Sequence, residues 1–217
     1  MAVNRGGGVA RGGRRTEGLD LPYRRRLVAG GHGRWLGVGG VGDYRGVGTT
    51  VDEALGEAVD KTAKMLGLGF PGGPEVEKAA RNGDESRFSL PRPMQGREGA
   101  DFSFSGLKTR IRQTIEGLAP GDLEDRDITD LCASFQAAVM DVLCKKLQRL
   151  VVRIDARSVA IGGGVAANSR LRSPVEALRH ALGLAADPAP RQPPGGHAAL
   201  IPGAGHLPVR ARRRRHL

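Results

Sequence analysis

Three consecutive glycines, Gly162 to Gly164, are the residues of this chain whose spacing points most directly to ligand chemistry. They follow a short apolar run, Val159 to Ile161, that is typical of a buried strand, and the residues after them, Val165 to Leu182, have helical spacing. A strand, a glycine turn and a helix together present free backbone N–H groups and the positive end of a helix to a phosphate. Glycine suits the turn because a Cβ would block the approach of a ligand. A tight turn that binds nothing is the alternative, since a glycine cluster alone is a weak signal.

A second glycine turn follows an apolar run near residue 30. Residues 27–36 (Leu-Val-Ala-Gly-Gly-His-Gly-Arg-Trp-Leu) are typical of a short strand that enters such a turn. Residues 38–48 are rich in glycine and valine, which favours a hairpin of short strands. With helices predicted between the two turns, the order of elements suits a nucleotide held between two turns of one α/β lobe.

Several familiar motifs fit this chain poorly. Gly162, Gly164 and Ala167 have the spacing of the dinucleotide fingerprint, but no second strand with an acidic end follows about 20 residues on. Neither glycine cluster ends in the Gly-Lys-Ser/Thr of a Walker A loop, and no Ser-His-Asp set can be assigned from spacing. No i, i+4 histidine pair of the kind found in metal sites occurs among the five histidines, His32, His180, His197, His206 and His216.

The clearest predicted helix runs from Thr50 to Gly67. Thr50 and Glu53 have the spacing of a capping box, and Gly67 is a plausible stop. An apolar stripe at helical spacing is formed by Val51, Leu55, Ala58, Val59, Thr62, Met65 and Leu66. Asp60 lies on the opposite, charged face of this helix. It could bind a ligand, or it could be an ordinary solvated residue without a function.

Further helices are predicted on both sides of an acidic loop. Pro74, which ends a turn at residues 70–74, is well placed to open a helix over residues 75–81. A second helix reaches about Leu118, and a long third helix spans Asp127 to Leu150. Lys146 interrupts the apolar stripe of the long helix, where its stem is long enough to reach water.

Two short strands are predicted among these helices. Residues 87–90 form the first, before Pro91. Residues 101–109 alternate Phe and Ser in the manner of a strand before the chain enters the helix that reaches Leu118, and Phe102 and Phe104 are predicted core residues.

The net charge of +11 sits entirely in the two ends of the 217-residue chain. Of the 34 Lys and Arg residues, 14 lie outside residues 43–183, and of the 23 Asp and Glu residues, 3 lie outside that range. Residues 43–183 therefore contain 20 charges of each sign. The basicity therefore says little about the partner of the folded part. Residues 1–26 are rich in Gly and Arg, and residues 184–217 in Pro, Ala and Arg, which predicts disordered or non-native segments.

Cysteine usage and hydropathy bear on location. Cys132 and Cys144 are predicted on one helix, about 18 Å apart at 1.5 Å per residue, so they cannot form a disulfide with each other. Two reduced cysteines fit a cytoplasmic protein. No apolar run approaches the roughly 18 residues of a membrane span, and the N-terminus lacks the apolar core of a signal peptide.

Four segments resemble, in sequence, order and spacing, the TsaD/Gcp family of tRNA adenosine threonylcarbamoyltransferases, once described as O-sialoglycoprotein endopeptidases. They are residues 59–64 (Val-Asp-Lys-Thr-Ala-Lys), 70–74 (Phe-Pro-Gly-Gly-Pro), 101–109 (Asp-Phe-Ser-Phe-Ser-Gly-Leu-Lys-Thr) and 163–168 (Gly-Gly-Val-Ala-Ala-Asn). The third segment is the most specific, and the resemblance covers about residues 27–183.

The resemblance implies an α/β protein with the two-lobed actin/Hsp70-like (ASKHA) ATPase fold, of which residues 27–183 would form mostly the second lobe. It implies an acyltransferase that moves a threonylcarbamoyl group from threonylcarbamoyl-adenylate to the exocyclic amine of the adenosine beside the tRNA anticodon. Such an enzyme must hold the adenylate, orient the amine and stabilise charge on the carbonyl and phosphate oxygens. An iron or zinc ion, a tRNA substrate, companion proteins and a cytoplasmic location are also implied.

The family's binding residues transfer to this chain by motif. The phosphate-side turn corresponds to Leu27, Val28, Ala29, Gly30 and Gly31. Asp60 corresponds to the carboxylate that binds the ribose hydroxyls. Gly73 corresponds to the position where the backbone approaches the sugar or base. Glu77 stands where many members have Asp, and Asn168 corresponds to the adenylate-contacting Asn. Ser103, Ser105 and Lys108 belong to the third segment, and no catalytic role is assigned to them.

The chain departs from the family pattern at both ends. The family's first lobe, with its own phosphate loop and a His-x-x-x-His metal pair, is not found here. The segment that carries the third metal ligand, an Asp, corresponds to residues 195–202 (Gly-Gly-His-Ala-Ala-Leu-Ile-Pro), which have none. No metal ligand is therefore predicted in this chain. The abrupt changes of composition suggest that both ends are out-of-frame translations of a GC-rich gene, which resequencing would test.

Two alternatives to an active transferase remain from the sequence. The first is a non-catalytic remnant or scaffold that keeps the family's helices for contact with partners. The second is another nucleotide-binding protein of the ASKHA fold, such as a sugar kinase or an acetate-kinase-like protein, against which the Phe-Ser-Phe-Ser-Gly-Leu-Lys segment argues.

Overall fold

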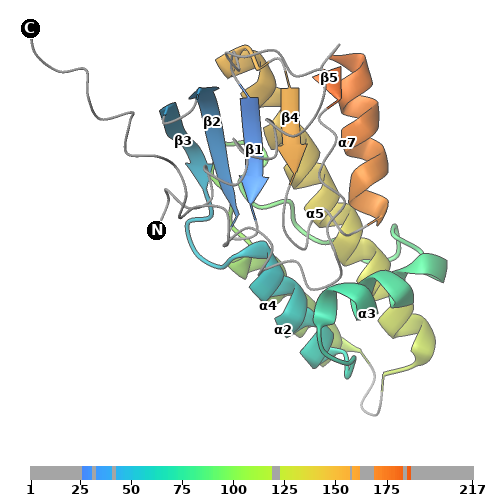
Figure 1. Cartoon of the computed structure of the whole chain (residues 1–217). Helices are drawn as coiled ribbons and strands as arrows, with labels where there is room; N and C mark the ends of the chain where they lie inside the picture. The colour runs from blue at the N-terminus through green and yellow to red at the C-terminus, as the bar shows by residue number, and fades with distance from the viewer. Residues whose placement is uncertain are drawn as a thin grey trace, which may run out of the picture.

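A five-stranded sheet with helices beside it forms the part of the chain that the computed structural model describes, which is residues 26–30, 33–40, 43–118, 123–156, 158–161, 169–182 and 185–186 (Figure 1). The strands are β1 (Arg26–Gly30), β2 (Arg34–Gly40), β3 (Asp43–Thr49), β4 (Ser158–Ile161) and β5 (Ala185–Ala186). Their order across the sheet is β3-β2-β1-β4-β5. The α/β class predicted from the sequence is confirmed.

The sheet combines an antiparallel meander with a parallel half. β1 pairs antiparallel with β2, and β2 with β3, so the hairpin predicted over residues 38–48 is confirmed. β4 runs parallel to β1, with Ala29 opposite Ile161, and β5 runs parallel to β4. Because β1 and β4 are parallel, the chain leaves both strands at the same edge of the sheet.

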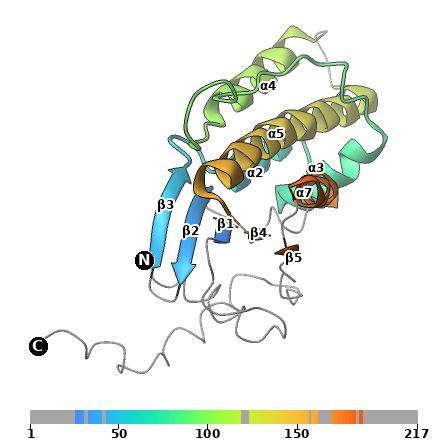
Figure 2. The ribbon, with the colours of Figure 1, turned by 90° about the horizontal axis from the view of Figure 1, so that it is seen from above.

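The helices are α2 (Leu55–Met65), α3 (Gly72–Ala79), α4 (Ser105–Gly117), α5 (Asp125–Ile154) and α7 (Ser169–Ala181), and a short 3₁₀ helix, η1 (Ala80–Asn82), follows α3. In Figure 2 these helices lie on one side of the sheet, with α5 between the strands and α4. In Figure 1, α2, α3 and α4 lie beyond the edge toward which β1 and β4 point. No helix of the described residues is long and apolar enough to cross a membrane.

The core forms around α5 and a row of three aromatic side chains. Trp35 lies 5.4 Å from Phe102 between ring centroids, and Phe102 lies 5.9 Å from Phe104. All three are buried, so the predicted core role of Phe102 and Phe104 is confirmed. α5 buries Leu131, Phe135, Ala138, Val142, Leu147 and Leu150, and its buried positions extend around more than one face of the helix.

The predicted start of the helix at Thr50 is wrong, because α2 begins at Leu55. Thr50 forms no capping box with Glu53, and its hydroxyl donates instead to the carbonyl of Gly33 at 3.1 Å. Residues 49–51 are held in extended form by backbone bonds to Phe102, which donates to Thr49 and accepts from Val51 at 2.9 Å each. This pairing overrides the local helix signal, and Val51, predicted in the apolar stripe, is 59% exposed.

The boundaries of two other predicted helices also shift. α3 begins at Gly72 rather than at residue 75, with Pro74 in its first turn, where a missing N–H costs no helical bond. α5 extends beyond the predicted range at both ends, and the side chain of Asp127 accepts from the N–H of Glu124 in a capping box.

Neither predicted strand among the helices forms. Residues 87–90 are irregular, and residues 101–104 contribute only a single parallel bridge, Thr50 with Phe102. The alternation of Phe and Ser still has a structural cause, since the Phe side chains enter the core while the Ser side chains remain half-buried.

The expectation that Lys146 reaches water is wrong. Its side chain is fully buried, and its Nζ donates to the carbonyl oxygens of Arg97 at 3.0 Å and Gly99 at 3.1 Å. Burial lowers the pKa of Lys146. Lys146 therefore fastens the loop before residue 101 to α5.

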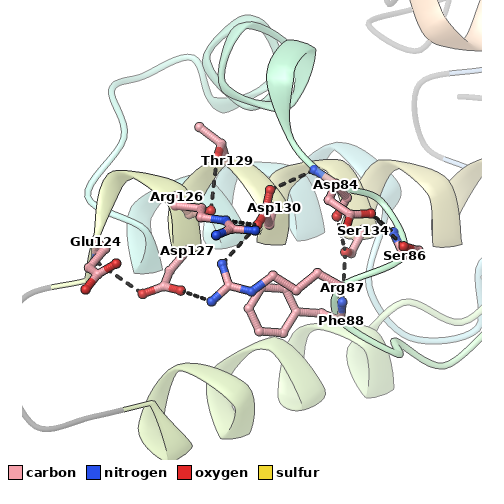
Figure 3. A network of polar contacts seen from close by, with 10 residues as sticks. All are labelled: Asp84, Ser86, Arg87, Phe88, Glu124, Arg126, Asp127, Thr129, Asp130 and Ser134. Atoms are coloured by element: carbon pink, nitrogen blue, oxygen red, sulfur yellow. Dashed lines mark hydrogen bonds and ion pairs between the residues drawn. The ribbon is translucent and has the colours of Figure 1, made fainter.

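A second polar network fastens residues 83–88 to the start of α5 (Figure 3). Arg87 donates to Asp127 at 2.5 Å and to Asp130 at 2.9 Å, and the N–H of Asp84 donates to Asp130 at 2.7 Å. At Gly83 a Cβ would lie 2.1 Å from the carbonyl oxygen of Thr129, so this loop runs against the helix backbone. The network orients α5, which covers the sheet.

Candidate nucleotide site at the carboxyl edge of the sheet

The carboxyl ends of β1 and β4 meet at one edge of the sheet. In sheets of this kind, ligands bind outside the carboxyl ends of the parallel strands. Leu27, Val28, Ala29 and Gly30 lie in β1, with Gly30 as its last residue. Gly31, the glycines 162–164 and Asn168 fall outside the described residues, so their place in the site stays a prediction.

Asp60 on α2 fixes the beginning of α3. Its Oδ1 accepts a hydrogen bond from the N–H of Gly72, the first residue of α3, at 2.9 Å. This satisfies one of the N–H groups that a helix leaves unpaired at its start. Within the described part of the chain, the second oxygen of Asp60 has no hydrogen-bond partner. Asp60 is thus half-buried and joins two helices instead of standing alone on a solvated face, while its binding role stays a prediction.

Gly72 lets α2 and α3 approach this closely. A Cβ at Gly72 would lie 2.8 Å from the Cα of Asp60 and 2.8 Å from the Cβ of Ala63. At Gly73 nothing lies within 4 Å of such a Cβ. Gly72 is thus required by the fold, whereas Gly73 exposes open backbone beside Asp60.

The structure brings three of the predicted site residues together on two contacting helices. Asp60 lies on α2, and Gly73 and Glu77 lie on α3 one turn apart, on the same face of that helix. Glu77 is half-buried and has an interaction partner. Phe70, in the turn before α3, is 87% exposed, which is the highest exposure among the large apolar side chains that the structure describes.

Asp52 is a residue that the sequence analysis missed. It lies shortly after the end of β3 at Thr49, at the same sheet edge, and its Oδ2 accepts from the hydroxyls of Ser103 and Ser105 at 2.5 Å each. Its Oδ1 accepts from the N–H groups of Glu53 at 2.5 Å and Phe104 at 3.0 Å. Burial alone would raise the pKa of Asp52, but these hydrogen bonds outweigh it and hold the pKa well below its usual range. With both oxygens occupied, Asp52 positions α4 rather than offering a base.

Glu53 extends this network into the core. It is buried, it forms an ion pair with Lys61, and the Nζ of Lys108 lies 3.1 and 3.0 Å from its two carboxylate oxygens. Burial would raise the pKa of Glu53, but the two lysines lower it below its usual value. The third segment of the resemblance therefore has a structural role that the sequence did not reveal: its Ser and Lys side chains hold Asp52 and Glu53, which directly precede α2, the helix that carries Asp60.

We expect Asp52→Asn to weaken this link. An Asn oxygen can still accept hydrogen bonds from N–H groups, but its NH₂ group cannot accept hydrogen bonds from the hydroxyls of Ser103 and Ser105. We therefore expect the free energy of unfolding to fall by about 1–2 kcal/mol at pH 7. Because the pKa of Asp52 lies below 3.8 in the folded chain, wild type binds fewer protons folded than unfolded. The stability difference should be full above about pH 4 and shrink below it.

Urea unfolding of both proteins between pH 3 and 7 measures that difference. Asp141→Asn, at an exposed carboxylate that pairs with Arg92, is the control. Equal stability of Asp52→Asn and wild type at pH 7 would contradict the assigned role.

No metal-binding group of three or more His, Cys, Asp or Glu side chains occurs among the described residues. They do not fit the iron or zinc ion that the resemblance implies, so the chemistry below is assigned to this chain's own side chains. Cys132 and Cys144 on α5 are free, as predicted, and burial raises the pKa of Cys132 to about 12, which leaves its thiol unreactive.

The sheet and the ligand-facing edge define an α/β protein with a candidate nucleotide site. Comparison with known proteins is more specific. A family model for tRNA N6-adenosine threonylcarbamoyltransferase, TsaD, matches residues 1–189. Proteins named tRNA N6-adenosine threonylcarbamoyltransferase from Brucella ovis, Brucella canis and Brucella suis are 51% identical over 196 residues, which cover 86% of this chain and 54% of each relative.

The chain belongs to the TsaD family. The resemblance inferred from the four segments is thereby confirmed, and with it the ASKHA-type fold of which the described sheet and helices form a part. The chain spans about half the length of the curated relatives it matches. The family match begins at residue 1, and the predicted division at residues 26 and 183 stays a prediction.

Proposed function

We propose that this chain supplies the nucleotide-holding lobe for threonylcarbamoyl transfer to an adenosine of tRNA. Family membership supports the reaction class. The observation that carries the assignment of the site is the position of Asp60. One of its oxygens accepts from the first N–H of α3, while the other has no partner among the described residues and lies beside the open backbone of Gly73. A carboxylate oxygen in this position can accept a hydrogen bond from a ribose hydroxyl.

The proposed reaction is acyl transfer. The exocyclic amine of adenosine attacks the carbonyl carbon of threonylcarbamoyl-adenylate, a C–N bond forms, the C–O bond to the adenylate phosphate breaks, AMP leaves and the amine loses a proton. Asp60 would hold the ribose, and Gly73 would let the sugar approach the backbone. The turns after β1 and β4, with Gly31 and Asn168, would donate N–H groups to the phosphate as it gains charge. The iron or zinc ion that the resemblance implies would have to be held by residues outside the described part of the chain.

The proposal includes the surroundings of the reaction. The substrate macromolecule is tRNA, companion proteins of the threonylcarbamoyladenosine pathway assist, and the place of action is the cytoplasm. The family assignment and the free thiols on α5 support this setting.

Asp60→Asn tests the site. An Asn oxygen can still accept from Gly72 N–H and cap α3, so the fold should be retained, whereas the charged acceptor for the ribose is lost. We expect AMP affinity, measured by titration calorimetry on the purified chain, to fall about 10-fold or more, which corresponds to a charge-assisted hydrogen bond of about 1.5–3 kcal/mol.

Glu57→Gln on the same helix is the matched control, since among the described residues its exposed carboxylate pairs only with Lys61. Wild type should bind AMP more tightly than its 2′,3′-dideoxy analogue, and Asp60→Asn should bind both alike. Equal AMP binding by wild type and Asp60→Asn would refute this site.

Transfer itself is tested by expressing the chain in cells that lack the native enzyme and measuring threonylcarbamoyladenosine in their tRNA by mass spectrometry. Restored modification supports catalysis. Nucleotide binding without restored modification favours the scaffold or remnant alternative. That alternative is relevant because the match covers 54% of each relative.

A further inference from the structure

A polar groove runs between α4 and the segment that precedes it. Its volume is about 610 Å³, and it is distinct from the surface around Asp60 and Gly73. Leu90, which is buried, and Pro91 contribute its apolar part. The polar side chains that line it are Ser89, Ser105, Thr109, Arg110 and Gln113.

The groove adjoins the sheet edge through Ser105. This hydroxyl lines the groove and donates to Asp52, which follows β3 at the carboxyl edge of the sheet. Ser105 therefore connects the groove to the residues that follow β3.

The two hydroxyls next to each other on α4 are oriented as acceptors. The hydroxyl of Ser105 gives its proton to Asp52, and that of Thr109 gives its proton to the carbonyl of Ser105 at 3.0 Å. Since each proton is already used, the lone pairs of both oxygens remain for a ligand that donates hydrogen bonds. Hydroxyl groups of a sugar are donors of this kind.

The groove also offers donors and a single charge. Arg110 is the one charged side chain in its lining, and within the described part of the chain neither the Arg110 nor the Gln113 side chain has a hydrogen-bond or ion-pair partner. An unpaired guanidinium presents five N–H donors in the planar arrangement that matches phosphate oxygens. Positive charge without an acidic neighbour in the lining excludes a cationic ligand and favours an anion.

Acceptors for hydroxyls beside a donor for phosphate match the repeating chemistry of a ribose-phosphate chain. We propose that this groove binds the backbone of the RNA substrate, with Arg110 on a phosphate and Ser105 and Thr109 on ribose hydroxyls. The 2′-hydroxyl is the group that distinguishes RNA from DNA in such a contact. This inference rests on the proposed function, since it concerns the tRNA on which that function acts.

Arg110→Gln tests the inference, with Arg112→Gln as the matched control. Arg112 lies on the same helix, is exposed, pairs with Glu116 at 3.6 Å and does not line the groove. Binding of an unmodified tRNA transcript to the full chain is measured by fluorescence anisotropy at several salt concentrations. We expect Arg110→Gln to bind roughly 5–10-fold more weakly and to reduce the slope of log K against log salt by about 1, as for one lost phosphate contact. Arg112→Gln should stay within about twofold of wild type.

Thr109→Val supplies a second readout. It removes one hydroxyl acceptor on the exposed face of α4, so it should reduce the preference of the chain for an RNA oligonucleotide over a DNA oligonucleotide of the same sequence. Melting temperatures of all three variants should match wild type, because none of these side chains joins α4 to another element among the described residues.

The outcomes separate this inference from the proposed function. If Arg110→Gln binds tRNA as Arg112→Gln does, the groove assignment is overturned while AMP binding through Asp60 stands. If Arg110→Gln weakens AMP and tRNA equally, the groove takes a mononucleotide and the RNA assignment is overturned. If wild type binds AMP but no tRNA, the groove and the tRNA part of the proposed function both fail, and the nucleotide site remains.

Discussion

Gly72→Ala should disrupt both the packing of α2 against α3 and nucleotide binding. The added Cβ would lie 2.8 Å from the Cα of Asp60 and from the Cβ of Ala63, closer than real Cβ contacts allow. Helix backbone cannot yield locally, so α3 must move away from α2 and lose the hydrogen bond from Gly72 to Asp60. Overpacking of this kind costs about 1–3 kcal/mol, and we expect the upper end here. Urea unfolding measures the stability, and calorimetry should find AMP affinity at least as weak as in Asp60→Asn.

Gly73→Ala is the matched control one residue later. Nothing lies within 4 Å of the Cβ it would add, and it stands in the first turn of the same helix. Its stability should equal or slightly exceed that of wild type, since Ala has the higher helix propensity. If Gly73→Ala nevertheless weakens AMP binding, the ligand approaches this backbone as proposed. Stability of Gly72→Ala equal to that of Gly73→Ala would contradict the tight packing inferred here.

Lys146→Ala should be among the most destabilising single changes in α5. It removes a fully buried stem and the hydrogen bonds to the carbonyls of Arg97 and Gly99. Truncating a buried long side chain costs about 2–5 kcal/mol, and a lost charge-assisted hydrogen bond adds to it, so we expect about 4 kcal/mol in urea unfolding.

Two variants separate the contributions at this position. Lys146→Met keeps most of the stem and loses only the hydrogen bonds, so about 2 kcal/mol is expected, because Arg149 still donates to the carbonyl of Arg97. Lys145→Ala changes the exposed neighbour and should stay within about 0.5 kcal/mol of wild type. A cost for Lys146→Ala no greater than for Lys145→Ala would show that the loop is not held by this lysine.

Local patterns predicted the elements well where packing and periodicity agree. The hairpin at residues 38–48, the burial of Phe102 and Phe104 and the long α5 follow from alternation, aromatic content and helical spacing. The capping box at Thr50 failed because a bridge to Phe102, far along the chain, determines the conformation there. A single sequence contains no signal for that pairing.

The candidate site likewise contains residues that the sequence predicted and residues that it did not. Asp60 and Gly73 were predicted through the resemblance, and the structure places them on contacting helices. Asp52 was missed because its partners, Ser103 and Ser105, are distant in sequence and its own position appeared to belong to a helix. Lys146 was misread because periodicity identifies a face of a helix but not the carbonyl groups that cover it.

The strand order also has a consequence for the order in which the chain folds during synthesis. β1 lies between β2, which follows it at once, and β4, whose Ser158 pairs with Arg26. The meander β1–β2–β3 consists of local contacts and can form early. The pairing of β1 with β4 can form only after the whole of α5 and β4 have left the ribosome. Until then β1 presents an unpaired strand edge, the kind of surface that recruits other chains. We therefore expect the nascent lobe to be most prone to aggregation while residues 50–157 are being made, and protection of this edge by a chaperone to be most valuable in that interval.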